Sequence, residues 1–170
     1  MATALFIKTT DLKRNSIIDG NVDVDKFIQF IKIAQQIDVR NLLGSKLYDK
    51  ISDDIIADNL TGDYLELLTD YIQPILIWFA QVNYIPFAAY QIKNGGVYKH
   101  TSENSENVSK EEVDYLVTKA QEYANYYSTR FVDYMSFNNS KFPEYNTNNN
   151  EDVYPNKDTT YRGWLLWDIK

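Results

Sequence analysis

Residues 109–139 constrain the fold of this chain more than any other segment. Ser109-Lys110-Glu111-Glu112 has the form of a capping box, in which the serine side chain accepts from the backbone N–H of Glu112 and the Glu112 side chain reaches back. Behind it, apolar and aromatic residues recur every three or four positions for about seven turns. We therefore predict one long helix that ends near Asn138-Asn139 and buries one face, made of Val113, Leu116, Val117, Ala120, Tyr123, Ala124, Tyr127, Phe131 and Tyr134.

Three further segments also have helical patterns. Residues 23–37 carry one apolar row and a second row of Phe30, Ile33 and Ile37, so we expect a helix packed on two sides. The next segment should form two helices that reach about residue 58, with a kink at Gly44 and Ser45 capping the second helix. Residues 63–93 are apolar on most faces and should form the centre of the fold, with helices that begin or kink at Pro74 and Pro86 and end at 94–96.

The predicted fold is all-α: a small antiparallel helical bundle with a long helix in its C-terminal half. Hydrophobic residues make up 44% of the 170 positions and charged residues 24%, a composition that supports one packed core. We predict a helical domain over residues 1–145. An exposed polar loop should occupy 97–108, and an extended tail should occupy 146–170.

Several classes of protein are disfavoured by composition. The chain has no cysteine and one histidine, which leaves no disulfide framework, thiolate nucleophile or zinc site of the usual kind. No signal peptide is recognisable at the amino terminus, and the apolar stretches are shorter than the roughly 20 residues of a membrane span. We therefore expect an intracellular or virion protein without a membrane partner.

The charge balance disfavours ordinary nucleic-acid binding. The formal net charge is −7, with 10 Lys and Arg against 12 Asp and Glu in residues 1–100 and 7 against 12 in residues 101–170. An acidic surface does not neutralise phosphates. An acidic surface is compatible with a protein along which DNA slides without binding.

No motif for catalysis is present. There is no glycine-rich phosphate loop, nucleophile elbow, paired histidine or calcium loop. The adjacent acidic pairs 53–54, 111–112 and 151–152 are interpreted as solvated faces and helix caps. The tyrosine row at 123, 127 and 134 could be a base-stacking platform, but without interleaved basic residues core packing or a subunit contact is the better interpretation. We predict no enzyme activity, cofactor or metal.

The polar loop and the tail are the candidate assembly elements. The tail is a polar tether that ends in an apolar cluster, and such a cluster must dock on its own domain or on a neighbour. An isolated histidine in the loop is interpreted as a surface imidazole. The candidate assembly contacts are Tyr98, His100, Tyr154, Tyr161, Trp164, Leu165 and Trp167.

Residues 34–51, AQQIDVRNLLGSKLYDKI, carry a resemblance to a known family. An Ala-Gln helix end, Leu-Leu-Gly and Leu-Tyr resemble the head–tail connector proteins of tailed bacteriophages, the adaptor or ring proteins. The resemblance extends to about residues 5–145 through the Asn-Gly-Gly break, the Ser-capped long helix and Phe-Pro-Glu-Tyr at 142–145. The richness in Asn, Lys, Ile and Tyr is similar to that of ring proteins from crAss-like phages.

The resemblance implies a structural role. It implies a viral protein of the virion neck, present in the host cytoplasm during assembly, in which about twelve copies form a homo-oligomeric ring. Its partners would be the portal protein and other neck or tail proteins, with genomic DNA passing through the ring.

Two other functions stay open at the level of sequence. An acidic phage-encoded inhibitor could bind a host DNA-binding protein by presenting a DNA-like surface. A carboxylate-dependent hydrolase would need a concave acidic cluster able to hold a metal.

Overall fold

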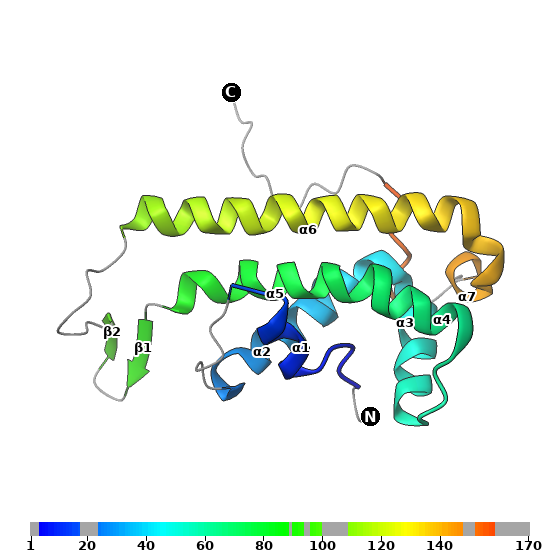
Figure 1. The fold of residues 1–170 in the computed structure, drawn as a ribbon, viewed down its shortest axis with the longest axis horizontal. Coiled ribbons are helices and arrows are strands. Elements are labelled where there is room, and N and C mark those ends of the chain that lie inside the picture. Colours follow the sequence, from blue (N-terminus) through cyan, green and yellow to red (C-terminus); the bar gives the residue numbers. More distant parts are fainter. Residues whose placement is uncertain are drawn as a thin grey trace.

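The structure is a computed structural model, which describes residues 4–17, 24–88, 90–93, 96–99, 109–147 and 152–158. These residues form the predicted all-α bundle, with one small antiparallel two-stranded sheet attached (Figure 1). In chain order the elements are α1 (Thr9–Arg14), α2 (Val24–Ala34), the π-helical η1 (Gln35–Val39), α3 (Arg40–Ile56), α4 (Gly62–Glu66), the π-helical η2 (Leu67–Ile72), α5 (Gln73–Ala88), β1 (Tyr90–Lys93), β2 (Gly96–Lys99), α6 (Lys110–Asn138), the 3₁₀ turn η3 (Asn139–Lys141) and α7 (Pro143–Asn146).

Helices α5 and α6 form the long axis of the molecule. They lie antiparallel and side by side, with α1 and α2 on the other side of α5 and with α3, α4 and α7 gathered at one end (Figure 1). The small sheet lies at the opposite end. One continuous core joins these elements, and it includes Phe27, Ile31, Leu42, Leu47, Leu67, Ile72, Leu76, Phe131, Met135 and Phe142.

Helix α6 has the predicted span and cap, but two residues of its predicted buried face are exposed, Leu116 by 40% and Tyr123 by 49%. Ser109 accepts from the backbone N–H of Glu112 at 3.2 Å, and the Glu112 side chain accepts from the backbone N–H of Ser109 at 2.8 Å. The predicted tyrosine row is in part a packing feature, because Tyr127 and Tyr134 are partly buried against the core. The ring of Tyr134 stacks on that of Tyr71, with 4.0 Å between centroids.

Pro74 stands near the start of α5, as predicted. It follows the π-helical η2, after which the N–H of Gln73 donates to the carbonyl of Leu68, five residues earlier. Arg130 of α6 donates to the carbonyl oxygen of Asp70 at 3.3 Å, and its guanidinium lies 4.7 Å from the ring centroid of Tyr71. The two long helices are therefore joined by polar as well as apolar contacts.

An extended arm before α1 is held by the side chains of two glutamines, the buried Gln35 and the partly buried Gln73. Gln35 Oε1 accepts from the backbone N–H of Phe6 at 2.8 Å, while its Nε2 donates to the carbonyl of Ala4 at 2.7 Å and to the Tyr48 hydroxyl at 2.9 Å. Gln73 Nε2 donates to the carbonyl of Phe6 at 2.9 Å. These bonds replace the partners that a strand would have found in a sheet.

Two predictions about the helices were wrong. The helix through Pro86 ends at Ala88 rather than near Lys93, and the chain then forms β1, which pairs with β2 so that Lys93 lies opposite Gly96. The alternating residues of these strands and the Asn-Gly dipeptide between them suit a hairpin better than a helix end. Residues 97–99 thus belong to a strand, and 100–108 lie outside the described residues.

The second apolar row, which runs from α2 into η1, is also less buried than predicted. Phe30 is buried, but Ile33 is 38% exposed and Ile37 is 52% exposed. Helix α5 packs against α2 and η1, and this contact leaves Ile33 and Ile37 partly open to solvent. Of the helices that the structure describes, none has the length and apolar content to cross a membrane.

Candidate functional site

Helix α3 is broken at Gly44. This residue has φ 74° and ψ 161°, an extended conformation with positive φ that is essentially restricted to glycine. In an unbroken helix the N–H of Ser45 would donate to the carbonyl of Asn41, four residues earlier. The break separates these two groups and leaves each of them in need of a partner.

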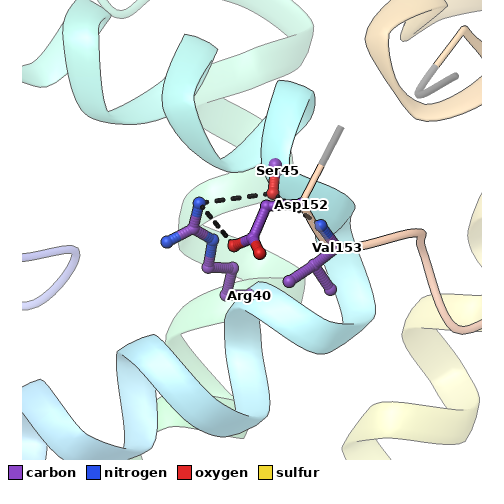
Figure 2. A network of polar contacts seen from close by, with 4 residues as sticks. All are labelled: Arg40, Ser45, Asp152 and Val153. Carbon is purple, nitrogen blue, oxygen red and sulfur yellow. Dashed lines mark hydrogen bonds and ion pairs between the residues drawn. The ribbon is translucent and has the colours of Figure 1, made fainter. Parts of the chain in front are cut away.

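Residues 152–158, which we call the C-terminal strap, supply both missing partners. The N–H of Ser45 donates to the carbonyl of Val153 at 2.9 Å, and the carbonyl of Asn41 accepts from the N–H of Asn156 at 2.8 Å. The N–H of Val153 in turn donates to Ser45 Oγ at 3.0 Å (Figure 2). The strap lies more than a hundred residues further along the chain. It therefore supplies hydrogen-bond partners to both backbone groups that the kink at Gly44 has separated.

Pro155 fixes the strap sterically. It is the buried residue of the strap, and it lies directly over Gly44. A Cβ atom at Gly44 would stand 2.6 Å from both Cδ and Cγ of Pro155. Glycine is thus required here for its backbone conformation and also for the space that the proline ring fills.

The charged contacts at this site are weaker than the backbone ones. Arg40 Nη2 lies 3.3 Å from Ser45 Oγ and 3.4 Å from Asp152 Oδ2, and the Asp152 side chain is 73% exposed (Figure 2). An ion pair that is this long and this open to water contributes little to stability. Arg40 Nε is buried and has no hydrogen-bond partner among the described residues.

Replacing Asp152 with asparagine should therefore change little. We expect the free energy of unfolding to fall by less than about 1 kcal/mol, because the ion pair is exposed and the backbone bonds of the strap remain. Urea unfolding at low and at high salt would measure this. A larger loss, or a strap that detaches at high salt, would mean that charge rather than backbone pairing holds the strap.

Lys157 and Tyr145 form the second contact of the strap. The Lys157 ammonium lies 4.9 Å from the ring centroid of Tyr145 in α7 and 5.6 Å from that of Tyr154. Tyr145 is 3% exposed, and its hydroxyl has no hydrogen-bond partner among the described residues. Burial, with a smaller effect of Tyr154, raises the pKa of Tyr145 to about 12.

Replacing Tyr145 with phenylalanine should raise the free energy of unfolding near neutral pH by about 1 kcal/mol, because it removes a buried hydroxyl without a partner. It should also reduce the loss of stability in alkali. A tyrosine ionises near pH 10 in the unfolded chain, whereas folded Tyr145 keeps its proton to about pH 12. Between these two pH values the unfolded chain loses a proton that the folded protein keeps, so the free energy of unfolding falls by up to about 3 kcal/mol as the pH rises from 10 to 12.

Urea unfolding of both proteins across this pH range provides the measurement. Burial also raises the pKa of Tyr64, Tyr84 and Tyr134, so the difference between the natural chain and the variant isolates Tyr145. Two parallel pH profiles would contradict the assignment to Tyr145.

The structure places only part of the predicted assembly contacts. Tyr154 lies in the strap and is 61% exposed. Tyr98 is in β2, opposite Gln91, in the hairpin at the other end of α5. The structure does not bring these two together. The remaining candidates, His100, Tyr161, Trp164, Leu165 and Trp167, lie outside the described residues.

The tail was predicted to be an extended polar tether, but residues 152–158 dock on their own domain through Val153, Pro155 and Asn156. The one sequence signal for this contact is the proline with an apolar neighbour in an otherwise polar tether. Ser45 was expected to cap a helix, whereas its hydroxyl accepts from Val153.

The acidic residues in the described part of the chain do not form a metal site. No group of three or more His, Asp or Glu side chains there could hold an ion. Glu112 caps α6, which is a role predicted for these residues. Asp54 instead pairs with Lys50, and its side chain is only 14% exposed, so it does not lie on a solvated face.

Comparison with known proteins gives a family without an assigned activity. Residues 39–155 match the model of a family described as a family of unknown function, DUF6712. The match begins one residue before Arg40 and ends at Pro155, so it includes both the break in α3 and the proline that covers it. No match was found among the curated proteins or among the solved structures.

Proposed function

The chain belongs to the DUF6712 family, and we propose that it is a structural, non-enzymatic subunit of a ring in the head–tail connector of a tailed bacteriophage. The ring would join the portal to the tail and line the channel through which DNA passes. The proposal starts from the resemblance of residues 34–51 to connector adaptors, which extends more weakly to residue 145.

The observation that carries this proposal is the strap on α3. A terminal segment that pairs through its backbone with a preformed break can be exchanged between identical subunits at little cost, since the same bonds form in cis and in trans. Residues 147–151 connect α7 to the strap and consist of Thr, three Asn and Glu, which gives a polar connection with little to bury. Such an element suits a protein that is built to be joined to copies of itself.

The charge of the chain fits the same role. A net charge of −7 gives a channel subunit that DNA can pass without binding. The expected partners are copies of this chain, the portal protein and neighbouring neck or tail proteins. The expected location is the virion neck, after assembly in the host cytoplasm.

Two deletions test the proposal. One removes residues 146–170, which include the strap and the aromatic end, and the other removes only 159–170 and keeps the strap. Particle masses would be measured for the chain alone and together with the proteins encoded beside it. We expect the longer deletion to prevent ring formation and the shorter one to retain rings of reduced stability. Rings that form normally without residues 146–170 would contradict an assembly role for the strap.

A further inference from the structure

The outer face of α6 carries an internal repeat of 11 residues. Residues 115–125 read YLVTKAQEYAN, and residues 126–136 read YYSTRFVDYMS. In both, an aromatic residue is followed by threonine, a basic residue, an acidic residue and tyrosine at the same spacings. Phe137 then begins a third copy with another aromatic residue.

Eleven residues make about three helical turns, so equivalent positions of the repeat lie nearly in line along the helix. Tyr115, Tyr126 and Phe137 are 61%, 64% and 87% exposed, which is unusual for three large rings in one row. The buried residues of α6, among them Ala124, lie about half a turn away and face the core. Figure 1 shows α6 at the edge of the molecule, with α5 along one side.

Charged residues alternate with the three rings. Lys119 and Glu122 stand between Tyr115 and Tyr126, and Lys119 Nζ lies 2.7 Å from Glu122 Oε2. Arg130 and Asp133 occupy the same positions between Tyr126 and Phe137. The row formed by Tyr115, Lys119, Glu122, Tyr126, Arg130, Asp133 and Phe137 is called the α6 ridge below.

We propose that the α6 ridge is a contact surface for a second copy of this chain, paired antiparallel about Tyr126. In this arrangement Tyr126 meets its own counterpart, and Tyr115 of each copy meets Phe137 of the other. Lys119 then lies opposite Asp133. Glu122 lies opposite the helix position of Arg130, whose guanidinium packs on Tyr71 and donates to the carbonyl of Asp70 within its own copy. The Lys119–Asp133 pairs thus bring opposite charges together on both sides of Tyr126, and every ring faces a ring.

The charge pattern of the ridge favours the antiparallel pair over a parallel pair in register. A parallel pair in register would place Lys119 on Lys119 and Asp133 on Asp133, which is unfavourable for each charged position. The antiparallel contact is isologous, so it closes after two copies. It is therefore separate from any ring contact and does not depend on the proposed connector role.

Single cysteines give a direct test, because the natural chain has none. In a glutathione redox buffer only thiols held close together retain a disulfide. We expect Tyr126→Cys to form a disulfide-linked dimer. Tyr115→Cys and Phe137→Cys should each remain monomeric, since identical residues would lie about 33 Å apart in the antiparallel pair. A mixture of these two variants should give a mixed dimer.

Each outcome decides for or against the proposal. Ile56→Cys, at a 55% exposed position at the end of α3, provides the control for random collision. Dimers of Tyr115→Cys with itself would indicate a parallel pair and would contradict the proposed antiparallel register. If Tyr126→Cys did not cross-link above the level of the Ile56 control, the α6 ridge would not be a contact surface between copies. Cross-linking that occurs only after residues 159–170 are removed would show that the chain's own end covers the ridge, and this would also overturn the proposal.

A charge exchange tests the pairing by a second route. Lys119→Asp should weaken the dimer at least about tenfold in sedimentation experiments, because it places two aspartates opposite each other. The double variant Lys119→Asp/Asp133→Lys restores opposite charges and should recover the original affinity within about threefold. Equal weakening by the single and double variants would contradict a direct contact between these positions. Formation of the connector ring is measured in a separate experiment, so a failure of the ring proposal and a failure of the α6-ridge dimer can be told apart.

Discussion

Replacing Gly44 with alanine should release the strap and lower the free energy of unfolding by about 3 kcal/mol or more. This positive-φ extended conformation costs a residue with a Cβ about 1–3 kcal/mol. The added carbon would also stand 2.6 Å from two ring atoms of Pro155, so the strap must move. Its departure removes the partners of the Ser45 N–H and the Asn41 carbonyl and exposes the buried proline.

Gly62 offers a matched control for this experiment. It also has a positive φ, 61°, but a Cβ there would meet nothing within 4 Å. Gly62→Ala should therefore cost only the backbone strain, about 1 kcal/mol. Urea unfolding gives both energies, and proteolysis near residue 152 reports release of the strap. Equal losses for the two variants, with the strap still protected, would contradict the contact between Gly44 and Pro155.

Replacing Gln35 with leucine should lower the free energy of unfolding by about 3 kcal/mol and detach the amino-terminal arm. The Gln35 amide makes three hydrogen bonds, and two of them go to the backbone of the arm at Phe6 and Ala4. Leucine fills a similar volume but leaves a buried N–H and the Tyr48 hydroxyl without these partners. Phe6 and Ile7, both almost fully buried, would be exposed if the arm left.

Gln73→Leu is the control for Gln35, because the Gln73 side chain donates to the same arm through one bond to the carbonyl of Phe6. Its loss should cost about 1 kcal/mol. Hydrogen exchange at Phe6 and Ile7 would distinguish a detached arm from a uniformly weaker fold. If both variants lost the same stability with the arm still protected, the assigned role of Gln35 would be wrong.

Local patterns in the sequence predicted much of the fold. The capping box at Ser109, the apolar spacing of α6 and the kink at Gly44 all depend on residues within a few turns of one another. Such features can be read without knowing what packs against them. The all-α bundle follows from these helices and is confirmed by the structure.

The remaining features depend on partners far along the chain. The strap binds through backbone groups, which have the same chemistry in every residue, so its side chains give little indication of where it docks. The apolar spacing of α2 shows which residues share a face but not how many neighbours cover it, and this is why Ile33 and Ile37 were wrongly expected to be buried. The hairpin after Ala88 was missed because the apolar pattern of α5 continues into β1.

The native mass of the full chain, assembled with the proteins encoded beside it, is the decisive test of the connector role. We expect a closed ring of about twelve copies that carries the portal or another neck protein. We also expect Gly44→Ala to weaken this ring far more than Gly62→Ala does. A chain that stays monomeric beside those neighbours, or that instead binds a host DNA-binding protein and is displaced by DNA, would contradict the connector role.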